Sequence, residues 1–176
     1  MGEASLHIHQ PERHRGFATR IDQIMARPVQ CCRQQDTLAH AAQLMWDHDC
    51  GSLPVCGGDG VTRVVGVITD RDISMHALFQ GKPLQALRVS EAMAKQVQVC
   101  RPGDSLADAE KMMREARIRR LPVVDEQDVL VGMISLADLA QEAARERTAA
   151  SREITETEVG DTLAAICEPQ HRQLAA

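Results

Sequence analysis

The sequence predicts an α+β fold made of two copies of one strand–helix–strand–strand–helix unit. Residues 21–55 align without a gap over residues 89–123 at an offset of 68, and the phrase Val64–Ile73 recurs as Leu130–Leu139. A unit of about 60 residues buries too little core to stand alone comfortably. We therefore expect the two copies to pack sheet to sheet about a pseudo-two-fold axis. The identical aligned pairs are Met25/Met93, Ala26/Ala94, Val29/Val97, Gln30/Gln98, Cys32/Cys100, Arg33/Arg101, Asp36/Asp104, Leu38/Leu106, Ala39/Ala107, Ala41/Ala109, Met45/Met113, Leu53/Leu121, Pro54/Pro122 and Val55/Val123.

The first helix of each copy follows a short extended piece and a polar turn. Asp36 and Asp104 are predicted N-caps, with Thr37 and Ser105 beside them. Apolar residues then recur at helical spacing, which predicts helices that each bury one face. The extended pieces are Val29–Cys32 and Val97–Cys100, and the apolar helix positions are Leu38, Ala41, Ala42 and Met45 in the first copy and Leu106, Ala109, Met112, Met113 and Ala116 in the second.

Two apolar runs separated by turn residues predict a β-hairpin in each copy, followed by a second helix. Gly81 is a plausible stop for the first of these helices. One more helix is predicted in the tail around Val159–Ile166, ending at Pro169. The hairpin strands are Ser52–Cys56 and Arg63–Thr69, then Arg120–Val124 and Val129–Ser135; the turns are Gly57–Gly60 and Asp125–Asp128; the helices are Asp70–Gln80 and Leu136–Arg147. We expect an arm over 1–20, a first repeat over 21–80, a linker over 81–88, a second repeat over 89–144 and a tail over 145–176.

Composition limits the classes of partner. The net charge of −5 disfavours a general binder of nucleic acid or anionic membrane, which would usually show a basic face. No apolar run approaches the roughly 18 residues needed to span a bilayer. The first 20 residues lack the apolar core of a secretory signal, so we expect a cytoplasmic protein. Its six cysteines form no CxxC pair and are expected to be reduced thiols.

The N-terminal arm carries His7, His9 and His14, a spacing that could suggest a metal site. Metal ligands are usually held by ordered elements and by further hydrogen-bonding partners. Nothing in residues 1–20 promises either, so we interpret the arm as a loose polar terminus.

The end of each hairpin carries the residues with most chemical potential. Thr69 and Asp72 stand three apart, as do Ser135 and Asp138. This spacing is that of a helix capping box. It also suits a ribose site, because a carboxylate accepts hydrogen bonds from two vicinal hydroxyls and helix N-terminal amides favour a phosphate. Both interpretations stay open, since one turn can present both.

Three arginines lie just before the Leu-Pro of the second copy, at Arg117, Arg119 and Arg120. They could be a solvated helix end that complements the helix dipole, or a phosphate-binding cluster, for which the guanidinium group is well shaped. The first copy has Gly51 and Ser52 at the corresponding place. Its nearby cations are Arg71 and Arg27, so two pockets with unequal anion binding are expected.

Taken in order, these phrases closely resemble the CBS domain pair, also called a Bateman module, in its stand-alone bacterial form. Each phrase alone is weak, but their ordered repetition over residues 21–144 is strong. The carriers are Ile24-Met25 and Ala92-Met93, Asp36-Thr37-Leu38 and Asp104-Ser105-Leu106, Leu53-Pro54-Val55 and Arg119 to Val124, Gly66 to Asp72 and Gly132 to Asp138.

The resemblance implies tandem βαββα units, a flat homodimer of pairs and two nucleotide clefts. It implies a regulatory module, not an enzyme, that binds AMP, with ADP or ATP as further candidates, and signals to an unknown downstream protein. No bound cofactor is expected. The implied ligand-binding residues are Thr69, Asp72, Ser135, Asp138, Arg71, Arg117, Arg119, Arg120, Pro122, Val29, Gln30, Gly51, Ser52, Pro54, Val97, Val99 and Ile118. Ser52 departs from the family's basic residue before Leu-Pro, which puts phosphate contacts in the first cleft in doubt.

Three alternatives compete with this interpretation. The module could bind S-adenosylmethionine, or act as a ligand-independent dimeric interaction module. It could also sense thiol oxidation, because Cys31 and Cys32 are adjacent and Cys100 echoes Cys32; small buried hydrophobic side chains are the preferred explanation of these cysteines. An enzyme is disfavoured because the sequence has neither GxSxG nor HExxH.

Overall fold

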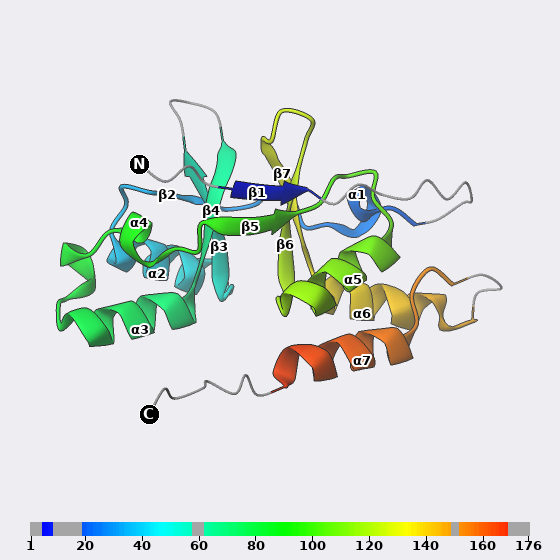
Figure 1. Cartoon of the computed structure of the whole chain (residues 1–176). Coiled ribbons are helices and arrows are strands. Elements are labelled where there is room, and N and C mark those ends of the chain that lie inside the picture. Colours follow the sequence, from blue (N-terminus) through cyan, green and yellow to red (C-terminus); the bar gives the residue numbers. More distant parts are fainter. Residues whose placement is uncertain (1–4, 9–18, 58–61, 149–151, 169–176) are drawn as a thin grey trace. The chain divides into compact units, whose positions relative to one another are not determined.

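The computed structural model describes residues 5–8, 19–57, 62–148 and 152–168 (Figure 1). The chain divides into two compact units, which are described separately below. Unit 1 comprises residues 1–9, 26–101 and 122–133, and unit 2 comprises residues 10–25, 102–121 and 134–176. No helix in the described part of the chain is long and apolar enough to cross a membrane.

Unit 1 contains most of the first repeat together with strands of the second. Its elements are β1 (Ser5–Ile8), β2 (Cys32–Arg33), α2 (Leu38–Asp47), β3 (Ser52–Gly57), β4 (Arg63–Thr69), α3 (Asp70–Gln80), the 3₁₀ helix η1 (Leu84–Ala86), α4 (Val89–Ala92) and β5 (Gln96–Val99). Two further strands, β6 (Arg120–Val124) and β7 (Leu130–Ser135), are divided between the units. Both repeats therefore show the expected order of strand, helix, two strands and helix, each preceded by a short helix.

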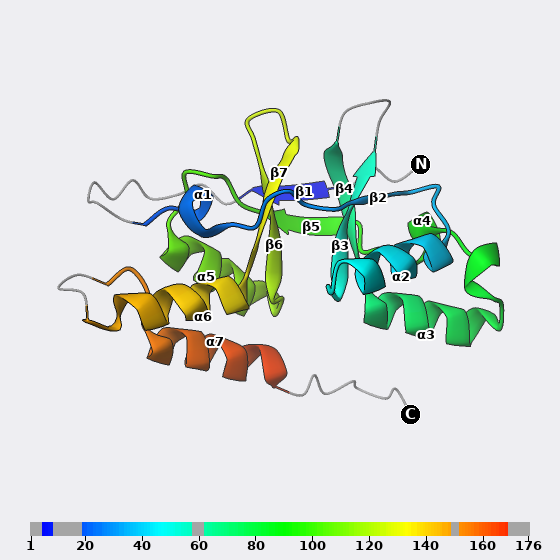
Figure 2. The same cartoon turned by 180° about the vertical axis from the view of Figure 1, so that it is seen from behind.

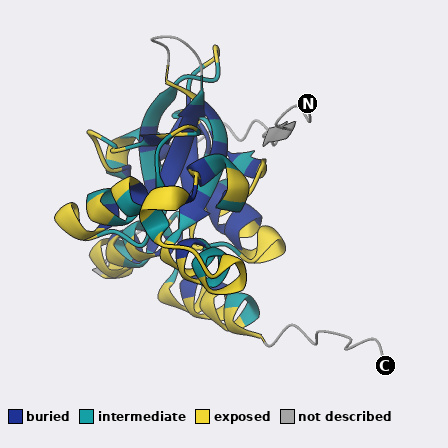
Figure 3. Cartoon of the chain, turned by 90° about the vertical axis from the view of Figure 1, so that its left-hand side faces the viewer, coloured by how far each residue is buried: buried dark blue, intermediate teal, exposed yellow. Residues whose placement is uncertain are grey.

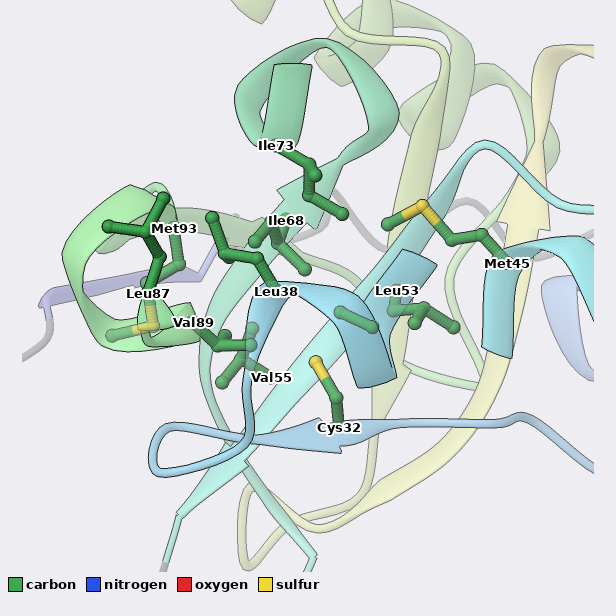
Figure 4. Packing of buried hydrophobic residues seen from close by; sticks show 11 residues of the cluster. Cys32, Leu38, Met45, Leu53, Val55, Ile68, Ile73, Leu87, Val89 and Met93 are labelled. Carbon is green, nitrogen blue, oxygen red and sulfur yellow. The ribbon is translucent and has the colours of Figure 1, made fainter. Parts of the chain in front are cut away.

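The core of unit 1 lies between the sheet β2-β3-β4 and the helices α2 and α3. β2 runs parallel to β3, and β3 runs antiparallel to β4 with Ser52 opposite Thr69. Figure 4 shows Leu38, Leu53 and Ile68 meeting in this cluster. Figure 3 shows buried strands and exposed outer helix faces, the pattern expected of amphipathic helices packed on a sheet.

The interpretation of residues 1–20 as a loose arm is wrong for one segment. β1 pairs in parallel with β5, with Leu6 opposite Val97 and Ile8 opposite Val99 (Figure 1). The alternation of Leu6 and Ile8 with polar residues is a short strand signal that histidine-rich surroundings obscured. The side chains of His7, His9 and His14 lie outside the described residues, as do hairpin-turn residues 58–61.

Unit 2 is a helical layer formed by α1 (Ile21–Ile24), α5 (Leu106–Ala116), α6 (Leu136–Arg145), the 3₁₀ helix η2 (Glu146–Thr148) and α7 (Glu156–Cys167). α7 packs along both α5 and α6 (Figure 2). It buries Val159 and Thr162, and Thr162 Oγ1 donates a hydrogen bond to Glu110 on α5. The tail helix thus begins three residues before the predicted Val159, because Thr155 and Glu158 form a capping box.

The N-caps of α2 and α5 differ from the prediction by one residue. Thr37 and Ser105 are the caps, and their side chains accept from the backbone N–H groups of His40 and Asp108. Asp36 instead accepts from Arg33 N at 2.7 Å and closes the preceding turn. Both residue types cap well, so local propensity did not decide between neighbours. Gly81 ends α3 in the left-handed conformation, as predicted.

Candidate functional site

The first strand-to-helix junction is a capping box at the start of α3. Thr69 Oγ1 accepts from Asp72 N at 3.1 Å, and Asp72 Oδ2 accepts from Thr69 N at 2.9 Å. The Thr69 hydroxyl also donates to Asp72 Oδ2 at 2.7 Å. Both residues are half-buried. The structural interpretation of their spacing is therefore confirmed.

The second junction repeats this geometry at the start of α6. Asp138 Oδ2 accepts from Ser135 N at 2.8 Å and from the Ser135 hydroxyl at 2.7 Å, and Asp138 N donates to Ser135 Oγ at 3.2 Å. In both repeats the cap uses Oδ2, while Oδ1 takes part in no hydrogen bond among the described residues. Each half-buried carboxylate thus keeps an acceptor oxygen beside a helix N-terminus.

The segment before each Leu-Pro lies against the junction of its own repeat. Asp70 N donates to Gly51 O at 3.2 Å, and Leu136 N donates to Arg119 O at 2.9 Å. The bonds are equivalent, because Gly51 and Arg119 align in the repeat. The structure thereby brings Gly51 and Ser52 to Thr69 in unit 1, and Arg119 to Ser135 in unit 2, as the sequence interpretation required.

Ser52 provides an unsatisfied polar group at the first junction. It lies on β3 directly opposite Thr69 of β4 and is only 6% exposed. Its Oγ is buried without a hydrogen-bond partner among the described residues. An unpaired buried hydroxyl costs about 1–3 kcal/mol, so a polar ligand atom or a water at this place would be stabilised.

The arginines separate into two groups. Arg117 ends α5 with a positive φ and forms an ion pair with Glu168 at 3.2 Å, so it is engaged with the residue that ends α7. Arg119 and Arg120 are exposed, as is Arg71 on α3, and these three side chains have no ion pair within the described ranges. The cluster of three predicted from sequence therefore leaves two cations available beside the second junction.

The other predicted contacts vary in accessibility. Gln30 is exposed and Val29 and Ile118 are half-buried, whereas Pro54 and Pro122 are buried. Val97 and Val99 lie in a hydrophobic cluster with Val64 and Val124, so their side chains face core. They can offer a ligand only backbone groups, and one edge of their strand pairs with β1.

Nothing in the described residues forms a metal centre, because no group of three or more His, Cys, Asp or Glu side chains lies together. A thiol pair was missed by the sequence interpretation, which compared Cys31 with its neighbour Cys32. Cys31 shares a side-chain hydrogen bond with Cys56 from β3. The signal that reveals this pair is in the repeat, where both positions change together to valine.

Comparison with known proteins gives a consistent result. The CBS domain family model matches residues 21–78 and 89–145. The CBS domain-containing protein YhcV of Bacillus subtilis is 39% identical over 120 residues, which cover 68% of this chain and 82% of that protein. Hypoxic response protein 1 of Mycobacterium tuberculosis is 33% identical over 146 residues, covering 83% and 92%.

Solved structures agree. Hypoxic Response Protein I, whose crystal structure has two coordinated zinc ions, matches with a TM-score of 0.63 and 36% identity over 70% of this chain and 98% of that one. The CBS domain pair of protein MJ0100, solved in complex with methylthioadenosine and S-adenosyl-L-methionine, matches with a TM-score of 0.63 and 25% identity, covering 70% and 94%. With the family model matched twice and the two junctions built alike, this chain belongs to the CBS domain family and is a tandem CBS pair of the regulatory kind.

Proposed function

We propose that this CBS pair is a regulatory module that binds an adenine nucleotide at its two strand-to-helix junctions. AMP is the first candidate ligand, with ADP and ATP next. The observation that carries the proposal is the second carboxylate oxygen of Asp72 and Asp138. Each cap leaves Oδ1 as an acceptor beside helix N-terminal amides, and it does so in both repeats.

The chemistry of each junction fits a ribose. Oδ1 accepts from the vicinal hydroxyls, and a charge-assisted hydrogen bond of this kind contributes about 1.5–3 kcal/mol. At the first junction the buried Ser52 hydroxyl adds a group that needs a partner. The helix N-termini favour a negatively charged phosphate nearby.

The two junctions should differ in how they bind phosphate. Arg119 and Arg120 adjoin the second junction, where guanidinium groups bind phosphate oxygens bidentately. The first junction has Ser52 at the place of Arg120, and its exposed arginine within the junction is Arg71. We infer that the second junction binds the nucleotide more tightly and discriminates more strongly for phosphate.

Isothermal titration of the full chain with AMP, ADP, ATP and S-adenosylmethionine tests this proposal. Asp72→Asn and Asp138→Asn keep one oxygen for the cap but remove the charge, so each should weaken binding at its own junction by about 10- to 150-fold. Asp108→Asn is the control, because Ser105 caps α5 by accepting from Asp108 N and also donates to Asp108 Oδ2, as Thr69 and Ser135 do at their junctions.

The result can go against the proposal in two ways. Absence of heat with all four ligands, together with no ligand-dependent rise in melting temperature, would refute nucleotide binding. Equal weakening by Asp108→Asn would assign the effect to helix capping alone. Heat with S-adenosylmethionine only would replace the nucleotide by the ligand class held in the MJ0100 structure.

We further propose that the module works as a homodimer in the cytoplasm, with the α2 and α3 helices of two copies in contact. Trp46 on α2 is 84% exposed, and Leu78 and Phe79 on α3 are 70% and 73% exposed. An open hollow of about 470 Å³ between these helices is lined by Met45, Trp46 and Ile73. Large apolar side chains gathered on one helix pair are typical of an interaction surface.

The proposed cytoplasmic location rests on the cysteines. The six free thiols support a reducing compartment.

Sedimentation equilibrium tests the dimer. Trp46→Glu should convert a dimer into a monomer, because a charge would be buried without a partner in the interface. Leu163→Glu is the control, since Leu163 is an exposed apolar residue on α7. A wild-type chain that sediments as a monomer at all concentrations would refute the dimer, and an unchanged mass for Trp46→Glu would move the interface elsewhere.

A further inference from the structure

Two cysteines of the first repeat lie on the same face of neighbouring segments of unit 1, two positions apart in register. β2 and β3 run parallel, with Cys32 opposite Val55 and Arg33 opposite Cys56. Cys31 directly precedes β2, and its thiol shares a hydrogen bond with the thiol of Cys56 near the end of β3. Cys31 is half-buried, and Cys56 is 6% exposed.

The sequence neighbour Cys32 does not belong to this pair. Successive residues of an extended chain point to opposite faces. Cys32 is 1% exposed in the core beside Leu38 and Val55 (Figure 4), and its thiol donates to Pro54 O at 3.9 Å. Burial raises its pKa to about 12, which leaves it protonated and unreactive.

The second repeat has apolar residues at the two equivalent positions. At the offset of 68, Val99 and Val124 take the places of Cys31 and Cys56. The strands keep the same pairing, because Cys100 bridges Val123 in parallel and its thiol donates to Pro122 O at 3.8 Å. Val99 and Val124 are fully buried in one hydrophobic cluster. The first repeat therefore carries thiols at two positions that are apolar and share one buried cluster in the second repeat.

The environments of the two thiols suit different roles. The hydrogen bond from Cys56 and the nearby charge of Arg33 lower the pKa of Cys31 to about 7, against the opposing effects of burial and Asp36. The same hydrogen bond and burial raise the pKa of Cys56. Cys31 is thus the thiol that attacks a disulfide at neutral pH. Cys56 is the thiol that can then attack the mixed disulfide at Cys31 and release the bound thiol.

We propose that Cys31 and Cys56 form a reversible disulfide when the protein meets a low-molecular-weight disulfide such as oxidised glutathione. The Cys31 thiolate attacks one sulfur of the reagent, forms a mixed disulfide and releases one glutathione as its thiolate. The Cys56 sulfur then attacks Cys31, loses its proton and releases the second glutathione. Two protein thiols are oxidised, one glutathione disulfide is reduced, and both glutathiones leave as thiols.

The site is independent of nucleotide binding and goes beyond the proposed function. It ties the chain just after Val29–Gln30 to the strand that begins at Ser52. In a cytosolic protein a disulfide of this kind is usually transient, and the half-buried Cys31 gives the reagent access.

The test treats the reduced full chain with oxidised glutathione and maps tryptic peptides without reduction. Cleavage after Arg20, Arg33 and Arg63 gives peptides 21–33 and 34–63, which should become linked with the loss of two hydrogen atoms and no retained glutathione. Because each peptide holds a second cysteine, Cys32→Ala and Cys50→Ser should leave the link intact. Cys31→Val and Cys56→Val should each abolish it, and both carry the residue found in the second repeat.

Several results would overturn the proposal. These are a persistent glutathione adduct without the link, a bond inside peptide 21–33, or a link that survives in Cys31→Val or Cys56→Val. A link that forms only when urea is added would show that the folded protein does not hold the thiols together. Reduction by dithiothreitol should restore the mass of the starting protein.

Discussion

The second helix layer of this chain has a cover and the first does not. α5 and α6 are packed against α7, which buries Val159 and Thr162 on them. The corresponding helices of the first repeat, α2 and α3, carry Trp46 and Phe79 largely exposed. Both copies of the duplicated unit therefore have apolar side chains on the outer face of their helix pair. In the second repeat α7 covers this face, and in the first repeat its apolar side chains are exposed.

The same comparison extends to single positions. Both repeats keep the junction caps and the cysteine that donates to the proline carbonyl. They differ at Ser52 and Arg120, and at the pair that is Cys31 and Cys56 in one repeat and Val99 and Val124 in the other. Positions that build the junction caps carry a hydroxyl residue and an aspartate in both repeats, whereas positions that we propose to meet phosphate or an oxidant differ.

The thiol difference predicts the largest effect. Cys31 should react with iodoacetamide at a rate that rises with pH around a midpoint of about 7, because its pKa is lowered to that value. Cys32 and Cys100 are each 1% exposed and should remain unmodified in the folded protein. Mass spectrometry of peptides after timed alkylation measures these rates. A midpoint at the ordinary value of 9.0 would remove the distinction between Cys31 and an unperturbed thiol.

The covered helix face predicts the next effect. A chain that ends after Arg152 loses α7 and the buried side chains of Ile154 and Val159. Each contributes about 1.5–3 kcal/mol by burial, so the free energy of unfolding should fall by about 3–6 kcal/mol in urea denaturation. Leu163→Ala, on the exposed side of α7, should stay within about 0.5 kcal/mol of the wild type. Undiminished stability of the shortened chain would mean that α7 is not a structural cover.

Ser52 predicts a smaller effect of opposite sign. Ser52→Ala removes a buried hydroxyl that has no partner among the described residues, so the ligand-free protein should gain up to about 1 kcal/mol in thermal unfolding. Ser105→Ala removes a satisfied N-cap and should cost about 1 kcal/mol. A loss of stability in Ser52→Ala would show that the hydroxyl is already satisfied in the ligand-free state.

Glu110 predicts the smallest effect, on the pH dependence of unit 2. Burial, with Glu158 and Asp161 nearby, raises the pKa of Glu110 despite Arg114. Glu110 therefore takes up its proton at a higher pH in the folded state than in the unfolded state. Its contribution to stability is complete below the ordinary value of 4.5 and is lost as the pH rises through the raised value. Glu110→Gln should remove this component when unfolding is measured between pH 7 and pH 5, and an unchanged profile would contradict it.

Much of the fold was predictable because the sequence contains the same structural unit twice. β4, α3 and β6 begin and end where the patterns placed them. Hydrophobic alternation, helix caps and turn residues act over a few neighbours, so they can be read locally. The choice of Thr37 over Asp36 as cap could not be read in this way, since both residue types cap well and the surrounding turn decides.

The residues of the candidate junctions could also be named from the sequence. Which of their polar atoms are left available for a ligand could not. Spacing identified Thr69 and Asp72, while only the structure shows which carboxylate oxygen the cap uses. The sequence offered three arginines within four residues without distinguishing them, and the packing of α7 engages Arg117 with Glu168. Such assignments depend on elements far apart in sequence.

By itself, the sequence determined the duplicated unit, its strand and helix order and the two caps, because these depend on short-range periodicity and spacing. Tertiary structure alone decided which cysteine meets which, which helix pair is covered and which hydroxyl is left without a partner. These are outcomes of strand pairing and helix packing between distant segments. The register that sets Cys56 opposite Arg33 puts Cys56 on the face of Cys31, and a shift by one residue would turn it to the other face.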